Sequence, residues 1–142
     1  MIRKISAAIA AASFALAAMP AAAQSEPEEA RTTYRILHLK LKPGADDRWS
    51  ELSAKYYGPA QDAAKIKRPT VYWLVSGSWD LMLVQEMPRG LAALDQHETP
   101  ERAAMRQAMA KIAGSEEAAK KIYAESDSLV AESTTTYSHT HP

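Results

Sequence analysis

The sequence predicts a small α+β domain whose elements follow in the order strand, helix, strand, strand, helix, strand. Residues 32–42 alternate between two faces with a period of two. Two apolar runs, 71–75 and 81–87, flank a short segment with the composition of a hairpin turn. Apolar residues at helical spacing lie between the first strand and this hairpin. A second such stretch lies between the hairpin and a C-terminal segment rich in Thr, Val and Tyr.

The first strand has two different faces and ends at a Pro-Gly pair, 43–44. One face carries Leu37, Leu39 and Leu41, and the other carries Tyr34, Ile36 and His38. Asp46 or Asp47 is expected to cap the following helix, which runs to about Ala64. The Gly-Pro pair at 58–59 is expected to kink or split that helix.

The second half of the domain begins with the hairpin, whose two strands are apolar on both faces and should be covered on both sides. A short helix is expected at 91–96. Thr99 and Pro100 then begin a long helix that stops at Gly114. Ser115 restarts a helix, and residues 129–140 form the last strand.

This order predicts a ferredoxin-like βαββαβ fold, an antiparallel sheet with helices on one face. The face of Tyr34, Ile36 and His38 is too rich in large side chains to face water alone. A second copy of the sheet is the simplest cover, so we expect a homodimer that forms a dimeric alpha/beta barrel.

Residues 1–23 have the pattern of a cleaved signal peptide. Arg3 and Lys4 precede an apolar run too short to span a membrane, and small residues lead to Ala23. Residues 24–31 read as a flexible linker and 32–142 as the domain. We therefore expect a periplasmic or secreted protein without membrane insertion after leader cleavage.

Composition excludes several classes of partner and site. Lys plus Arg falls from 17 to 15 when the leader is removed, while Asp plus Glu stays at 17, which gives a mature charge of about −2. That balance argues against a nucleic-acid partner. The chain has no cysteine, so it offers no disulfide and no thiolate.

Three segments resemble the stress-responsive dimeric alpha/beta barrel family and, more loosely, antibiotic biosynthesis monooxygenase-like proteins. They are residues 34–44 (YRILHLKLKPG), 79–86 (WDLMLVQE) and 94–101 (LDQHETPE). The resemblance implies a dimer whose two sheets enclose a barrel, often with a small apolar or aromatic ligand inside. The family pattern departs at the strand start, where Tyr34 stands and the His lies at position 38. Activities in this superfamily vary widely, so the fold implies a place for a site and no particular reaction.

His38 and Tyr34 are the candidate catalytic residues, because an imidazole in an apolar cavity can transfer protons near neutral pH. The alternative is that each only packs or hydrogen-bonds. Further candidate pocket-lining residues are Ile36, Tyr72, Trp73, Met82, Val84, Glu86 and Tyr137.

The remaining histidines are weaker candidates for a catalytic or binding site. His97 is expected to be structural. His139 and His141 supply too few ligands for a metal, and no metal or cofactor is expected. The chain contains no asparagine, so the Asn-Trp-His set of the superfamily's haem-degrading members cannot form.

Three hypotheses follow from these observations. The first is an exported homodimer that binds a small apolar or aromatic molecule. The second is a cofactor-independent monooxygenase- or isomerase-like enzyme on the same scaffold. The third is a structural envelope stress protein without a ligand. The sequence alone does not decide whether the protein is an enzyme.

Overall fold

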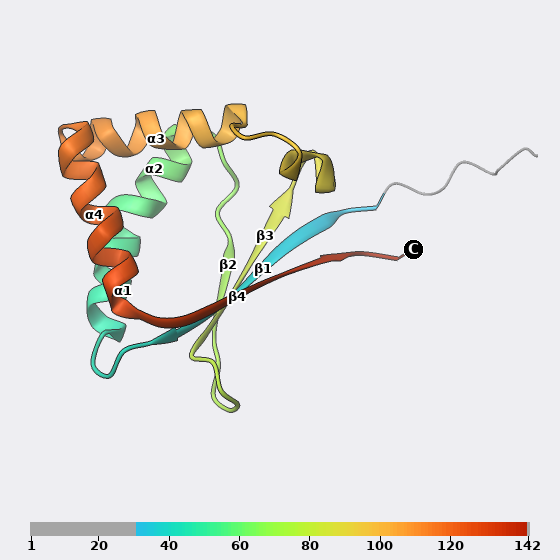
Figure 1. The fold of residues 1–142 in the computed structure, drawn as a ribbon, viewed down its shortest axis with the longest axis horizontal. Coiled ribbons are helices and arrows are strands. Elements are labelled where there is room, and N and C mark those ends of the chain that lie inside the picture. Colours follow the sequence, from blue (N-terminus) through green and yellow to red (C-terminus); the bar gives the residue numbers. More distant parts are fainter. Residues whose placement is uncertain (1–30, 142) are drawn as a thin grey trace, which may run out of the picture.

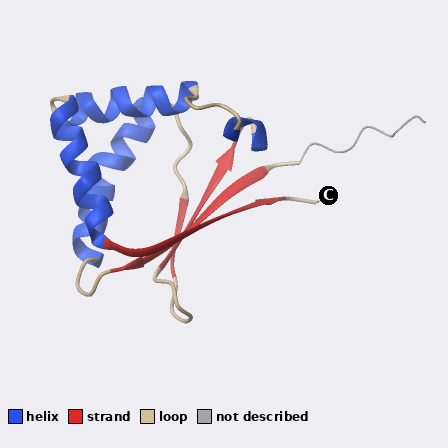
Figure 2. Ribbon diagram, viewed as in Figure 1, coloured by secondary structure: helices blue, strands red, loops and turns tan. Residues whose placement is uncertain are grey.

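The computed structural model describes residues 31–141, and the expected leader (residues 1–23) and nearly all of the linker lie outside this range. Four strands form one antiparallel sheet in the order β2-β3-β1-β4. Figures 1 and 2 show the helices gathered on one side of that sheet. The predicted α+β ferredoxin-like architecture, with helices on one face, is confirmed.

The strands lie close to their predicted positions. They are β1 (Thr33–Leu41), β2 (Thr70–Trp73), β3 (Leu81–Met87) and β4 (Val130–His139). The second strand is shorter than the predicted 71–75, and Val75 lies in the β2–β3 loop with its side chain fully in solvent. Asp80 closes that loop, because its carboxylate accepts from Leu41 N at 2.7 Å and its amide donates to Leu39 O at 2.9 Å.

The first helical segment has three parts: α1 (Asp46–Leu52), a π-helix η1 (Ser53–Tyr57) and α2 (Gly58–Ala63). The predicted aspartate cap is wrong. Ala45 is the N-cap residue. Asp46 and Asp47 lie in the first turn, where their negative charges interact favourably with the positive end of the helix dipole. The helix changes type at the predicted pair, because η1 ends at Tyr57 and α2 begins at Gly58. Pro59 lies in the first turn of α2, where its missing backbone N–H is tolerated.

The second helical half follows the predicted boundaries more closely. A 3-10 helix, η2 (Gly90–Leu94), replaces the expected short helix at 91–96. Thr99 caps α3 (Pro100–Ala113) by accepting from Arg102 N, and Gly114 ends it with a φ of 93°. Ser115 caps α4 (Glu116–Leu129) by accepting from Ala118 N.

Two separate groups of buried side chains hold the helices and the sheet together. The first joins β1, β3 and α1 through Leu39, Leu41, Ala45 and Leu81. The second joins α2, α3 and α4 through Ala60, Ala108, Met109 and Ala119. We call these groups the first and the second core. The first core packs α1 against the sheet, the second packs α2, α3 and α4 against one another, and a space remains between the two cores.

Among residues 31–141, no helix combines the length and the apolar character needed to cross a membrane.

Candidate functional site

Most of the residues proposed from the sequence lie together on the sheet face without helices. Across β1 and β3, Tyr34 lies opposite Glu86, Ile36 opposite Val84 and His38 opposite Met82. Tyr72 on β2 also lies opposite Met82, and its side chain is 48% exposed. We call this surface the open face. The His38 ring contacts Trp79, with centroids 6.0 Å apart and planes tilted by 42°.

Two proposed pocket residues belong to the other face. Trp73 pairs with Leu81 and Tyr137 pairs with Arg35, so both share a parity with the leucines that face the helices. Trp73 packs edge-on against Trp49 of α1 with a centroid distance of 6.0 Å. Trp73 and Tyr137 therefore lie on the opposite side of the sheet from His38, because side chains of opposite parity emerge on opposite sides of a sheet. Tyr137 instead lines a cavity on the helix side.

A cavity of about 340 Å³ lies on the helix side, between the two cores. We call it the apolar cavity. The sheet forms its floor with Leu37, Leu39, Val71 and Leu83, and Val130 adds an apolar edge. Neither His38 nor Tyr34 lines it. Its volume falls within the range of pockets that bind small organic molecules.

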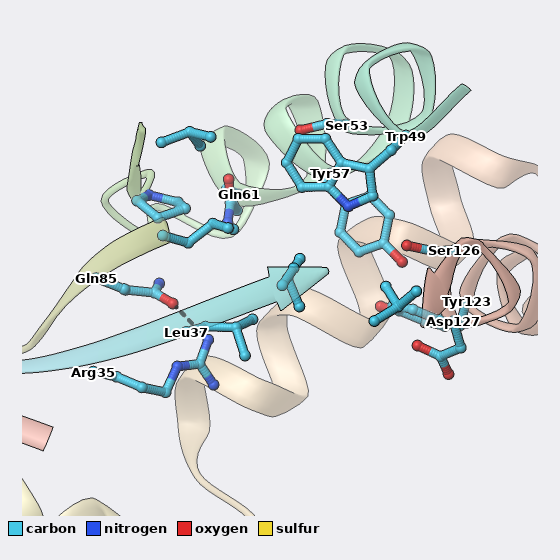
Figure 3. A pocket seen from close by; sticks show the side chains of 15 residues that line it. Arg35, Leu37, Trp49, Ser53, Tyr57, Gln61, Gln85, Tyr123, Ser126 and Asp127 are labelled. Atoms are coloured by element: carbon cyan, nitrogen blue, oxygen red, sulfur yellow. Dashed lines mark hydrogen bonds between the residues drawn. The ribbon is translucent and has the colours of Figure 1, made fainter. Parts of the chain in front are cut away.

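The roof of the apolar cavity comes from the first helical segment, which contributes one side chain in every four residues. These are Trp49, Ser53, Tyr57 and Gln61 (Figure 3). In a regular α-helix, residues four positions apart are rotated by about 40° around the helix axis. The side chains of Trp49 and Gln61 would therefore point about 120° apart. The π-helical turn between Ser53 and Tyr57 winds less per residue and returns all four to one side.

Polar groups lie at one end of this cavity. Tyr123, Ser126 and Asp127 of α4 line that end (Figure 3). Burial raises the pKa of Tyr57, and a hydrogen bond with Ser126 partly opposes this effect. Burial also raises the pKa of Tyr123, whose ring packs edge-on against Tyr57 with centroids 5.9 Å apart. Both phenols are therefore protonated at neutral pH and can donate a hydrogen bond into the cavity.

Arg35 and Gln85 form the opposite end. They face each other across β1 and β3, and Arg35 Nη2 donates to Gln85 Oε1 at 2.9 Å (Figure 3). Tyr137 flanks Arg35 on its other side in β4. These three residues place a polar row across the helix-facing side of the sheet, beyond the leucines.

A second cavity of about 530 Å³ adjoins the first, and the two share Arg35, Tyr57, Gln61, Gln85 and Tyr123 as lining residues. We call it the basic cavity. It lies among the loop after α2, the end of β3, η2 and the start of α3. Its charged lining residues are Arg35, Lys65, Lys67, Arg89, Arg102, Glu86 and Glu101.

Arg89 is the most enclosed cation of the basic cavity. Its Nη1 donates to Gln96 Oε1 at 2.9 Å, and its Nη2 lies 3.4 Å from Glu101 Oε2. Its Nε and Nη2 atoms are buried and make no hydrogen bond within the described part of the chain. A buried donor without an acceptor is costly, so an anionic group that reached these atoms would bind favourably.

Among residues 31–141 no histidine lines either cavity, and the sequence contains no cysteine. Within residues 31–141 no group of three or more His, Asp or Glu side chains comes together to hold a metal. His139 and His141 lie side by side at the exposed C-terminal end of β4, with their Nε2 atoms 3.1 Å apart.

Sequence reasoning missed the helix-side cavity, although two signals for it were present. Arg35 and Gln85 interrupt the apolar parity of Leu37–Leu39 and of Leu81–Leu83. The four-residue repeat from Trp49 to Gln61 places large and polar side chains on one side of a helix, next to a row formed by the buried Leu52 and Ala60 and the partly buried Tyr56.

Comparisons with known proteins support the fold. The sequence matches no protein-family model and no curated protein. The structure resembles a NipSnap family protein of unknown function from Agrobacterium tumefaciens strain C58, with a TM-score of 0.51 and 12% identity over 78% of this chain and 88% of that one. A second NipSnap family protein from the same strain gives a TM-score of 0.50 and 11% identity over 76% and 83% of the two chains. At these identities the likeness concerns the ferredoxin-like α+β fold alone.

Proposed function

We propose that the protein binds a small organic molecule in the apolar cavity between its sheet and its helices. The observation that carries this proposal is a concave space with an apolar floor and a roof that contains two aromatic rings, with charged groups at its two ends. Ligand sites have this composition, because apolar contacts supply affinity and a few polar groups set orientation. The site differs in location from the one expected from the sequence, since it lies beneath the helices.

A neutral fluorescent probe such as N-phenyl-1-naphthylamine tests this proposal. We expect saturable fluorescence enhancement with one site per chain. The Ser53→Trp variant should lose it, because the larger side chain enters the cavity from the π-helix. Ala54→Trp is the matched control, since Ala54 is the next residue of the same turn and is exposed. Equal binding by both variants, or no saturable binding by the native protein, would overturn the proposal.

We also infer that two copies associate through the open face. Ile36, Met82 and Val84 are only partly shielded by their neighbours in a single chain, and Tyr72 is half exposed. The helices α1 to α4 lie on the opposite side of the sheet and do not cover this surface (Figure 2). β4 borders it with Thr134, Thr136 and Ser138, which provide a polar rim beside an apolar centre. A two-fold arrangement would bury this centre against itself.

Export is the third part of the proposal and depends on the N-terminal pattern alone. The charged start, the short apolar run and the small residues before Ala23 favour cleavage after that residue. N-terminal sequencing of the protein recovered from a bacterial periplasmic fraction should begin at Gln24. An intact Met1 in a cytoplasmic fraction would contradict this expectation.

A further inference from the structure

We propose that the ligand is an organic anion whose apolar body occupies the apolar cavity and whose negative group lies at Arg35, facing the basic cavity. This inference rests on the proposed function and adds the charge and the orientation of the ligand.

The charge balance of the basic cavity is the first step. Within the described part of the chain, five cationic side chains and two carboxylates line it. Lys67 Nζ pairs with Glu86 at 2.7 Å, and Arg89 is near Glu101 at 3.4 Å. Both carboxylates are therefore already engaged, and Arg35, Lys65 and Arg102 have no carboxylate within ion-pair distance among residues 31–141. A concave surface with an excess of positive charge concentrates anions.

The position of Arg35 is the second step. Arg35 lines both cavities, and its hydrogen-bond partner Gln85 is neutral. Gln85 thus orients the guanidinium without neutralising it. A positioned guanidinium binds carboxylate and phosphate oxygens through charge-assisted, often bidentate, hydrogen bonds.

The polarity of the apolar cavity is the third step. Among residues 31–141, the charged residues that line it are Arg35 and Asp127, and Figure 3 shows them at opposite ends, with Trp49 and Tyr57 between them. An anion inserted with its charge toward Asp127 would meet a like charge. The reverse orientation places the charge at Arg35 and the apolar body over Leu37 and Leu83.

Three probes with the same ten-carbon chain separate this inference from the proposed function. They are decanoate, decanol and decyltrimethylammonium, each used below its micellar concentration and titrated by tryptophan fluorescence, for which Trp49 is the reporter within the cavity. We expect decanoate to bind the native protein about 10-fold or more tightly than decanol, as one charge-assisted hydrogen bond provides. Decyltrimethylammonium should bind more weakly than decanol.

The Arg35→Gln variant should reduce decanoate affinity about 10-fold and leave decanol within about 2-fold. Lys40→Gln is the matched control, because Lys40 lies in the same strand, points to the open face and lines neither cavity. It should change neither affinity.

Each outcome has a distinct meaning. Equal binding of decanoate, decanol and the cation by the native protein would overturn the charge inference and leave the binding function standing. An Arg35→Gln variant that loses decanoate and decanol equally would show a structural role for Arg35 and would also overturn the inference. Failure of all three probes to bind would remove the proposed function, and the inference with it. The native-protein comparison decides the question even if the variant does not fold.

Discussion

Arg35 and Gln85 face each other across β1 and β3, and their 2.9 Å hydrogen bond is a charge–neutral contact on the helix side of the sheet. The next two pairs between β1 and β3 on this face are apolar, namely Leu37 opposite Leu83 and Leu39 opposite Leu81. The polar pair lies where the two cavities meet. It divides an apolar surface from a charged one, and a ligand with two chemically different ends would match that division.

Converting the neutral partner into a charged one should remove the preference for anions. The Gln85→Glu variant keeps the size of the side chain and places a carboxylate against Arg35. The ratio of decanoate to decanol affinity should fall to about one, because the guanidinium is then neutralised. Gln107→Glu, at an exposed position of α3, adds the same charge outside both cavities and should leave the ratio unchanged.

Tyr57 and Tyr123 should make stability sensitive to high pH. Burial raises the pKa of both phenols in the folded state above the value of 10.0 for a free phenol. Below that pH both states are protonated and the contribution is fully present. As the pH rises past 10, the unfolded chain loses these protons first, so folding becomes less favourable. Thermal unfolding between pH 8 and 11 should show a steeper loss of Tm for the native protein than for Tyr57→Phe.

A second tyrosine variant serves as control for this measurement. Tyr137 is 44% exposed, lies outside the open face and does not line the apolar cavity. Tyr137→Phe should therefore keep the alkaline slope of the native protein. The same slope in all three proteins would show that Tyr57 ionises as freely in the folded chain as in the unfolded one.

Most of the fold follows from local sequence signals. The alternation of β1 identifies its two faces, and the leucine face does pack on the helices. Thr99, Gly114 and Ser115 mark helix ends because each satisfies terminal backbone groups in a way that depends on few distant contacts. β-branched residues place the last strand within one residue of its observed limits.

The location of the cavity could not be predicted in the same way. Alternation tells which side of a sheet a side chain takes, but it does not tell how closely the helices approach that side. That distance depends on the π-helical turn at Ser53–Tyr57 and on the packing of α2 against α3, which are tertiary features. The placement of Trp73 and Tyr137 on the face opposite His38 has a simpler cause, because the hairpin register and the pairing of β4 cannot be read from the sequence.

The first core should tolerate truncation poorly. Leu81 is completely buried between β1, β2 and α1, so Leu81→Ala removes apolar contacts and leaves a cavity. We expect a loss of about 2–5 kcal/mol in the free energy of unfolding, measured by urea denaturation. Val75→Ala, in the solvent-exposed hairpin loop, should change it by no more than about 0.5 kcal/mol. Similar losses for the two variants would contradict the core assignment.

A single charge at the centre of the open face should separate the proposed dimer. Ile36 lies between Val84 and Thr136 on the two neighbouring strands, so Ile36→Glu places a carboxylate in the middle of the apolar surface. In a two-fold interface the substitution appears twice, and both charges would have to leave water without a partner. Light scattering coupled to size-exclusion chromatography should give a dimer mass for the native mature protein and a monomer mass for the variant. Ala124→Glu, at an exposed position of α4, adds the same charge on the helix side and should leave the dimer intact. A native protein that is already monomeric at micromolar concentration, or an Ile36→Glu variant that still dimerises, would show that something other than a second sheet covers this surface.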